Sequence, residues 1–382
     1  MDILDIVMVI AGLLLLIAGG EALVRGASTL AVRVGLSPLV IGLVVVSAAT
    51  SAPEFATTVG AVSQGEPDLA LGNVVGSNIF NVLFILGLSA IISPLVIKRQ
   101  LVRFDIPVMV GLSVLLVVLS LDGQISVLDG VMLLAVLTIH TVVSIVVGRR
   151  VVTDPTSPPD TLPLNSKPVP LWLAGVLLLA GIGLLVLGAQ LLVDGAVSIA
   201  TGLGVSSLVI GLTVVAVGTS LPEIATSLIA LRRGETDMAV GNIVGSNIFN
   251  IGMVLGVPAV IFGGGIPVSA TAIAVDLPLM LATAVALLPI AFTGFIVARW
   301  EGALFVLLYV AYTLYLVLAS TGQDASDGFT TVMLFFVLPL VAATLVVVTS
   351  YEIGLLRGRR LKPDHGTAKG DDRTARGDGR AP

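Results

Sequence analysis

The chain of 382 residues is 56% hydrophobic and only 11% charged, whereas soluble globular domains carry about 25% charged residues. This composition excludes a soluble domain and indicates an integral membrane protein that is surrounded by the lipid bilayer, and we expect no nucleic-acid partner. Because the chain has no cysteine, disulfides, zinc–thiolate sites and thiol nucleophiles are also excluded.

The predicted elements are membrane-spanning helices, each of which needs about 20 mostly apolar residues. The first is acidic at its start and lacks a basic region, so we interpret it as a retained span and not as a signal peptide. In chain order, eleven spans are expected near residues 4–30, 36–63, 69–96, 104–121, 125–147, 170–200, 205–231, 238–262, 268–292, 299–320 and 329–351. The predicted fold class is therefore an all-α polytopic membrane protein.

The basic residues outside the spans fall on one side of the membrane if every span reverses the chain. That side holds Arg33, Lys98, Arg99, Arg103, Arg149, Arg150, Lys167, Arg232, Arg233, Arg299 and the tail from Arg357 onward. The other side holds acids such as Glu66, Asp68 and Asp122 and no lysine or arginine. Since basic loops stay in the cytoplasm, a multi-pass protein of the cell membrane is predicted, with its N-terminus outside and its C-terminus in the cytoplasm.

The chain contains an internal repeat. Residues 35–81 align without a gap with residues 204–250, and 29 of the 47 positions are identical. The repeated unit is five spans long, and because five is odd the second copy enters the membrane from the opposite side. Inverted repeats of this kind are typical of secondary transporters, whose site lies at the midplane between the halves.

The repeat also divides the chain. The predicted parts are a first five-span repeat (1–147), a cytoplasmic linker (148–168), a second, inverted five-span repeat (169–320), an additional transmembrane helix (321–351) and a disordered cytoplasmic tail (352–382). A lone histidine in the fifth span, His140, is expected to be an interhelical hydrogen-bond partner.

Two spans contain the motif TSxPE, which ends at Glu54 in the first copy and at Glu223 in the second. Proline removes a backbone donor and displaces the carbonyl four residues earlier, so we expect each helix to kink or break at Pro53 and Pro222. The carbonyls freed in this way are those of residues 47–50 and 216–219. A carboxylate inside a membrane is costly and marks a functional site.

Carboxylates, hydroxyls and free carbonyls together form the oxygen cage that hard cations bind, and Ca²⁺ takes 6–8 oxygens at about 2.3–2.6 Å. Two ionised glutamates repel, so one stays protonated at neutral pH unless a cation lies between them. A divalent ion neutralises both Glu54 and Glu223, and sodium ions or protons do so in its absence. We therefore predict a cation site between these carboxylates.

Two further spans contain the motif GNxxGSNxxN, whose glycines allow close helix packing. Ser77 and Asn81 lie four residues apart on one helical face, and Ser246 and Asn250 do the same in the second copy. These four are candidate side-chain ligands. The other asparagines suit two roles equally well, as cation ligands or as partners in hydrogen bonds between helices: Asn73, Asn78, Asn242 and Asn247.

Over residues 1–320 these paired motifs resemble the sodium/calcium exchanger branch of the calcium/cation antiporter superfamily. The resemblance implies that the first and sixth spans slide past a rigid block to alternate access, without any cofactor. It implies a calcium site formed by Glu54, Glu223 and the carbonyls of Thr50 and Thr219. The implied sodium sites use Ser51, Ser77, Ser220, Ser246 and the carbonyls of Ser47 and Ala216, with Asn81 and Asn250 completing the centre.

Some positions depart from the family pattern. Ala49 replaces the usual glycine before TS, and Ser47 replaces the usual alanine two residues earlier. Asn81 and Asn250 are both asparagine where some relatives have one aspartate, which argues against potassium co-transport. The proton-coupled branch carries GNxxE where this chain has GNxxGS, which favours sodium as the coupling ion.

The sequence therefore predicts a secondary antiporter that exports Ca²⁺ against inward Na⁺. The alternatives are exchange of Ca²⁺ for protons, transport of another divalent ion such as Mg²⁺ or Mn²⁺, and a cation channel built around the same acids. We expect no enzyme, because the chain contains no phosphate-binding loop, metalloprotease helix or catalytic triad. The sequence leaves the oligomeric state open.

Overall fold

The computed structural model describes residues 3–153, 170–204, 210, 214, 216–292 and 295–320, and the single positions 342, 346, 350 and 354. The predicted eleventh span and tail therefore lie outside the described residues, as do most of the linker and the start of the seventh span. Within the described part, seven helices are long and apolar enough to cross a membrane, and one bent pair of helices passes the same test.

The helices of the two halves follow one another in the same order, with π-helical turns (labelled η) at matching places. The first half contains α1 (Ile3–Val34), α2 (Pro38–Ile41), η1 (Gly42–Val46), α3 (Ser47–Thr50), α4 (Ala52–Gln64), α5 (Pro67–Phe80), η2 (Asn81–Leu86), α6 (Gly87–Ile92), η3 (Leu101–Asp105), α7 (Ile106–Leu119) and α8 (Val127–Thr153). The second half contains α9 (Leu171–Gly202), α11 (Ala216–Gly218), α12 (Leu221–Arg232), α13 (Thr236–Phe249), η5 (Asn250–Leu255), α14 (Gly256–Ile261), η6 (Ala272–Asp276), α15 (Leu277–Phe292) and α16 (Arg299–Ser320).

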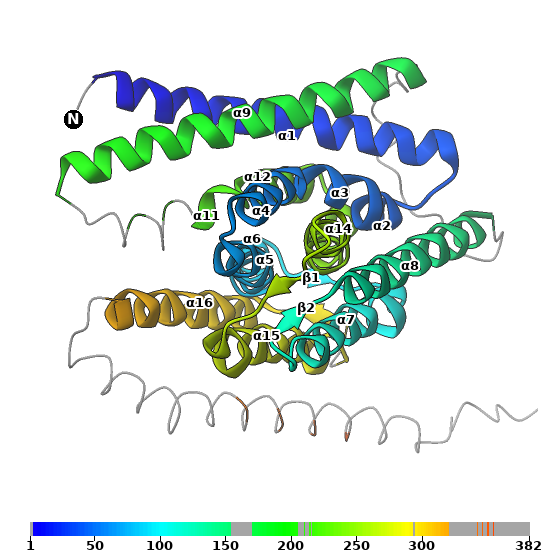
Figure 1. Cartoon of the computed structure of the whole chain (residues 1–382). Helices are drawn as coiled ribbons and strands as arrows, with labels where there is room; N and C mark the ends of the chain where they lie inside the picture. The colour runs from blue at the N-terminus through cyan, green and yellow to red at the C-terminus, as the bar shows by residue number, and fades with distance from the viewer. Residues whose placement is uncertain are drawn as a thin grey trace, which may run out of the picture.

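Two long helices, α1 and α9, pack against each other and lie across one face of the remaining bundle (Figure 1). Their contact is made by glycines spaced seven residues apart. A Cβ atom added to Gly12 would lie 2.7 Å from the carbonyl oxygen of Gly188, and one added to Gly19 would lie 2.9 Å from that of Gly181. The numbers of the contacting residues rise along α1 while they fall along α9, so the two helices are antiparallel. Only glycine allows two helix backbones to lie this close.

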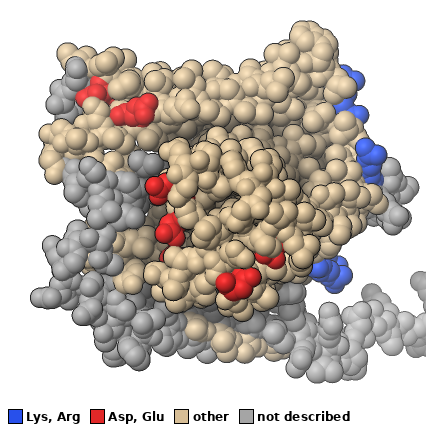
Figure 2. Space-filling model, in the orientation of Figure 1, with Lys and Arg blue, Asp and Glu red and all other residues tan. Residues whose placement is uncertain are grey.

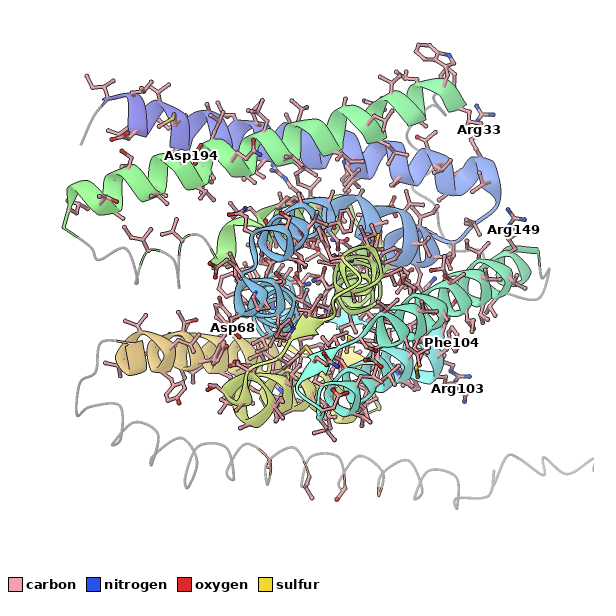
Figure 3. The ribbon with its side chains drawn as sticks, viewed as in Figure 1. Arg33, Asp68, Arg103, Phe104, Arg149 and Asp194 are labelled. Atoms are coloured by element: carbon pink, nitrogen blue, oxygen red, sulfur yellow. The ribbon has the colours of Figure 1, made fainter. Side chains whose placement is uncertain are left out.

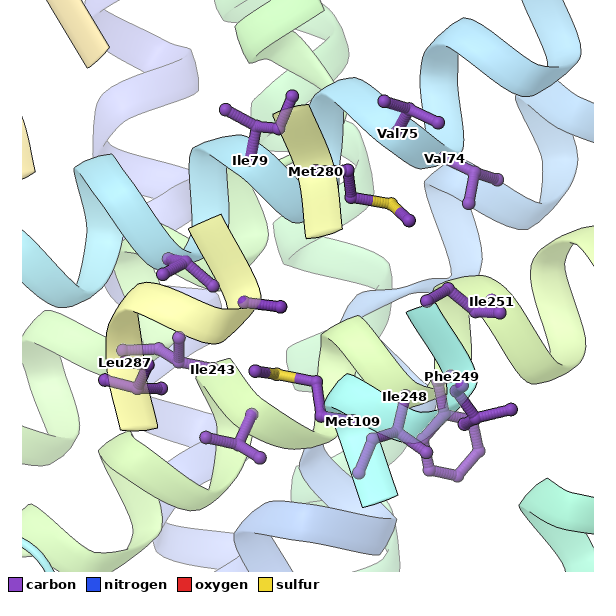
Figure 4. Packing of buried hydrophobic residues seen from close by; sticks show 14 of the residues in the cluster. Val74, Val75, Ile79, Met109, Ile243, Ile248, Phe249, Ile251, Met280 and Leu287 are labelled. Carbon is purple, nitrogen blue, oxygen red and sulfur yellow. The ribbon is translucent and has the colours of Figure 1, made fainter. Parts of the chain in front are cut away.

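The centre of the bundle is formed by α5 and α13, which carry the GNxxGSNxxN motifs. All twelve residues of α13 from Met238 to Phe249 are buried. Figure 4 shows Val74 and Ile79 of α5 and Ile243 of α13 packed with methionines from α7 and α15. Because these helices lie in the interior, polar motif residues such as Ser77, Asn242 and Ser246 are buried inside the protein.

Two short antiparallel sheets connect the halves. β1 (Leu95–Val96) pairs with β4 (Ile296–Val297), and β2 (Gln124–Ile125) pairs with β3 (Ile266–Pro267). Each sheet therefore takes one strand from each half, and the strand that follows α6 in the first half corresponds to the one that follows α14 in the second. These pairings satisfy backbone groups at the ends of the helices.

Charges are separated along the direction of the helices. Figure 2 shows basic residues at one end of this face and acidic residues elsewhere on it, most of them toward the other end. In Figure 3 Arg33, Arg103 and Arg149 lie on the basic side, and Asp68 and Asp194 lie toward the other. Surface charges that are basic at one end of the helices and mostly acidic toward the other fit a protein that crosses a membrane.

His140 on α8 bonds across to another helix, as expected. Its Nε2 lies 2.9 Å from Oδ1 of Asp105, the last residue of η3, and Ser144 donates to the same oxygen at 3.2 Å. All three side chains are buried. This polar cluster fixes α8 against the start of α7.

The turn between α12 and α13 is tied to α1 by two polar contacts. Arg233 forms an ion pair with Glu21 of α1, and Ser28 of α1 donates to Glu235 Oε1 at 3.1 Å. The Glu21 hydrogen bond raises the pKa of Arg233. Burial raises the pKa of Glu235, an effect that the hydrogen bond from Ser28 opposes. These contacts attach the long helix pair to the bundle.

Replacement of Glu235 by glutamine is expected to increase thermal stability at neutral pH. Because the pKa of Glu235 is raised in the folded state, the native protein binds this proton more tightly than the unfolded chain, and stability is lost as pH rises through the raised pKa. A glutamine side chain carries no charge to be buried, and its amide oxygen still accepts the hydrogen bond from Ser28. Melting curves of both proteins in detergent should therefore converge below the ordinary glutamate pKa of about 4.3. A stability difference that stays constant with pH would contradict this explanation.

Candidate functional site

Both TSxPE motifs break their helices at the same residue. The pair formed by residues 38–50 and 52–64 bends by 42°, and Ser51 lies between the two parts with φ −75° and ψ 5°. In the second half Ser220 has φ −90° and ψ 8° and lies in the turn between α11 and α12. The predicted breaks are thus confirmed, and they follow from Pro53 and Pro222, which can start a helix but cannot continue one.

The breaks place both glutamates at the start of a helix in the interior. Glu54 lies in the first turn of α4 and Glu223 in the first turn of α12, and both side chains are 0% exposed. The unpaired N–H groups at a helix start favour negative charge. The two helix starts also lie close together, because Ser220, three residues before Glu223, donates to Glu54 Oε1 at 3.0 Å. The structure therefore brings together the pair that the sequence predicts.

Serine hydroxyls from both halves lie at or near the carboxylate of Glu54. Ser220 Oγ donates to Glu54 Oε1 at 3.0 Å and lies 3.3 Å from Ser77 Oγ. Glu54 Oε2 has no hydrogen-bond partner among the described residues. Ser220 of the second half therefore contacts both the carboxylate of Glu54 and the hydroxyl of Ser77, which belong to the first half.

The residues equivalent to these do not form the same hydrogen bonds with Glu223. Thr50 and Ser246, which align with Thr219 and Ser77, have their hydroxyl oxygens 3.5 Å apart. Within the described part of the chain neither carboxylate oxygen of Glu223 has a hydrogen bond, and Ser51 Oγ has none either. Buried polar atoms are normally paired, since leaving one unpaired costs about 1–3 kcal/mol.

Asn81 and Asn250 each begin a π-helical turn, η2 and η5. Such turns are rare and often occur at functional sites. Both side-chain polar atoms of Asn81 are unpaired among the described residues, as is Oδ1 of Asn250. The Nδ2 group of Asn250 donates to Asn78 Oδ1 at 3.1 Å. Both asparagines thus carry buried side-chain oxygens without a hydrogen-bond partner among the described residues, as the two carboxylates do.

The remaining predicted ligands are backbone carbonyls. The carbonyl of Ser47 accepts from Ser51 N at 2.9 Å, and its hydroxyl donates to the carbonyls of Gly42 and Asn242. Thr219 lies in the turn between α11 and α12, and its hydroxyl donates to Asn73. Ala216 is the first residue of α11. These residues lie beside the two breaks, and their role as ligands stays a prediction.

The arrangement fits a cargo of hard cations. Its buried atoms are carboxylate, hydroxyl and amide oxygens with unused lone pairs, which are the ligands that Ca²⁺ and Na⁺ take. The described residues contain no group of three or more His, Asp or Glu side chains that could hold a metal ion, so the two glutamates supply the negative charge.

The sequence left the role of four asparagines undecided, and the structure shows hydrogen bonds for all of them. Asn78 and Asn247 bond within and between α5 and α13. Asn73 and Asn242 instead connect α5 and α13 to both motif helices. The sequence gives no signal for this difference, because Asn78 and Asn247 align with each other just as Asn73 and Asn242 do.

The sequence profile of the sodium/calcium exchanger protein family matches residues 4–146 and 173–318. The chain is 37% identical over 324 residues to the putative antiporter CaxA of Alkalimonas amylolytica, covering 82% of this chain and 98% of the relative. It is 38% identical over 261 residues to the inner membrane protein YrbG of Escherichia coli K12, covering 68% and 80% respectively.

The fold is also similar to solved structures. A structure of the sodium-calcium exchanger NCX_Mj soaked with Na⁺ and Ca²⁺ superimposes with a TM-score of 0.70 and 33% sequence identity. The match covers 85% of this chain and all of that chain. At this identity and coverage, the likeness extends through both halves of the bundle.

Proposed function

Because this chain belongs to the sodium/calcium exchanger family of membrane antiporters, we propose that it exchanges Ca²⁺ for Na⁺ by alternating access. The observation that carries the proposal is the pair of buried glutamates, Glu54 and Glu223, whose charges meet among unpaired oxygens. A site of this composition is unfavourable without a cation. The same site would bind either one divalent ion or monovalent ions.

Charge balance supplies the coupling. Two ionised carboxylates bind one Ca²⁺ with no net charge, and removal of that ion leaves a repulsion that only other cations relieve. Sodium ions then enter sites that share Glu54 and Glu223 with calcium. Full occupation by both ions at once would exceed the negative charge of the site, so binding of one ion favours release of the other.

We assign the ligands by their positions around the two breaks. Calcium would be held by Glu54, Glu223 and the carbonyls of Thr50 and Thr219. The proposed sodium ligands are the hydroxyls of Ser51, Ser77, Ser220 and Ser246 and the carbonyls of Ser47 and Ala216, with Asn81 and Asn250 between the halves. The unpaired or shared oxygens of these serines and asparagines support this division.

An inverted repeat supports alternating access. Two features agree with it: α1 and α9 are antiparallel, and the two small sheets correspond to each other, since each pairs the strand that follows α6 or α14 with the later strand of the opposite half. In this proposal the site lies at the midplane between the two halves, as is typical of transporters built from inverted repeats. With the basic ends in the cytoplasm, the N-terminus lies outside, and α1 and α9 are the elements that would slide.

The test is uptake of radioactive Ca²⁺ into proteoliposomes that contain the purified protein. Vesicles preloaded with Na⁺ should accumulate Ca²⁺, whereas vesicles with equal Na⁺ on both sides should not. Uptake that follows an outward proton gradient without Na⁺ would assign the protein to calcium–proton exchange instead. Entry of Ca²⁺ without any internal counter-ion would indicate a channel.

A further inference from the structure

Asn73 on α5 bonds to both halves of the chain. Its Nδ2 donates to the backbone oxygen of Glu54 at 3.0 Å and to Thr58 Oγ1 at 2.9 Å, both on α4. Its Oδ1 accepts a longer hydrogen bond, of 3.5 Å, from Thr219 Oγ1 in the turn between α11 and α12. One side chain thus joins the first carboxylate helix to the break in the second half.

Asn242 on α13 lies 169 positions later and repeats the two side-chain contacts of this arrangement, although not the one to the glutamate backbone. Its Nδ2 donates to Ser227 Oγ on α12 at 3.1 Å, and its Oδ1 accepts from Thr50 Oγ1 at 3.2 Å. Ser227 aligns with Thr58, and Thr50 aligns with Thr219. The same three-residue connection therefore occurs twice, with the roles of the halves exchanged.

The carboxamide is suited to this connection because it carries two N–H donors and an acceptor oxygen on one rigid group. In both copies the donors serve the asparagine's own half and the oxygen serves the opposite half. A carboxylate has no donor for the Glu54 backbone oxygen, and an aliphatic side chain has neither group. Helix packing alone does not require this use of the same atoms in both copies.

We propose that Asn73 and Asn242 are positioning residues that hold the two threonines of the breaks at the correct distance from the two glutamates. The inference rests on the proposed function, in which Thr50 and Thr219 provide carbonyl ligands. Asn73 holds Thr219 beside the start of α4, where Glu54 lies, and Asn242 holds Thr50 beside α12. The proposed threonine ligand of each half is thus held in position by an asparagine side chain of the other half.

The consequence is a specific loss of cation affinity. Without Asn73 or Asn242 the threonine hydroxyl is free to turn and the backbone of the break is no longer fixed, while the ligands themselves remain. Asn73→Ala and Asn242→Ala should each raise the Ca²⁺ concentration for half-maximal uptake about tenfold, the effect of one lost buried hydrogen bond. Calorimetric Ca²⁺ titration of the detergent-solubilised protein should show the same change.

Asn247→Ala is the matched control, since Asn247 lies on α13, is buried, and donates within its own helix to the carbonyl of Ile243 at 2.8 Å. Its half-saturating Ca²⁺ concentration should stay within about twofold of the wild type, because no residue of the two breaks bonds to its side chain. Variants of Asn73 and Asn242 that lower only the maximal rate, with unchanged Ca²⁺ affinity, would overturn the proposal and indicate a purely structural role.

A double-mutant cycle tests the contact itself. Thr219→Val removes the hydroxyl but keeps the backbone carbonyl, and combined with Asn73→Ala it should weaken Ca²⁺ binding no further than the stronger single change. Thr50→Val with Asn242→Ala should behave in the same way. Additive losses would overturn the proposal.

The two levels of inference separate in these experiments. If wild-type uptake follows protons, the proposed sodium coupling fails, yet the calorimetric Ca²⁺ affinities still test the positioning role. If the wild-type protein binds no Ca²⁺ in the titration, both fail.

Discussion

Glu54→Gln and Glu223→Gln are each expected to abolish sodium-driven Ca²⁺ uptake, to the level of protein-free vesicles. Each variant removes half of the negative charge from a buried site in which the described residues place only two nearby carboxylates. Loss of one partner from a buried, charge-paired set costs about 3–5 kcal/mol, which is more than a hundredfold in affinity. The measurement is radioactive Ca²⁺ uptake at saturating internal Na⁺.

The control for this pair is Glu66→Gln, which makes the same chemical change at an exposed residue just before α5. It should transport at the wild-type rate. Because glutamine is close in shape to glutamate, both site variants should also fold and elute as the wild type does from a sizing column. Wild-type uptake by a correctly folded Glu54→Gln or Glu223→Gln protein would refute the proposed site.

The helix breaks and the two buried glutamates beside them could be predicted from the sequence because the chemistry that produces them is local. Glutamate, proline and hydroxyl residues occur together in each motif, so a single alignment of the two halves identifies Glu54 and Glu223. Proline makes the helix break at Ser51 predictable from backbone chemistry alone. Where the structure describes the chain, the expected spans lie within a few residues of the observed helices, since span length is set by bilayer thickness; the eleventh span and the start of the seventh lie outside the described residues.

Other features depend on contacts that no local pattern specifies. Whether Asn73 is a ligand or a hydrogen-bond partner depends on which atoms of α4 and of Thr219 lie within reach, and an asparagine suits both roles. The small sheets pair residues such as Leu95 and Val297, which are too few to give a strand pattern. The seven-residue glycine spacing of α1 and α9 is visible in the sequence. The spacing on one helix does not say which other helix packs against it, and α9 becomes the candidate partner of α1 only because it has the same spacing.

That glycine contact leads to the second large expected effect. Gly181→Ala on α9 should lower the melting temperature and the transport rate, whereas Gly183→Ala should not. A Cβ atom at Gly181 would lie 2.7 Å from the backbone nitrogen of Leu23 and 2.9 Å from the carbonyl oxygen of Gly19 on α1. Backbone atoms cannot turn aside, so α1 and α9 must separate, and overpacking of this kind costs about 1–3 kcal/mol.

Gly183 provides the matched control because it lies two residues away on the same helix and a Cβ atom there would meet nothing within 4 Å. Both substitutions stabilise the helix by about 1 kcal/mol through the higher helix propensity of alanine. The difference in stability between the two variants therefore isolates the contact between the helices. The measurements are melting curves in detergent and sodium-driven uptake.

If α1 and α9 slide as one unit, separating them should slow transport by more than the loss of folded protein explains. The affinity for Ca²⁺ should be retained, because both motif helices are untouched. Equal behaviour of the two variants would mean that the close contact is not needed for the movement.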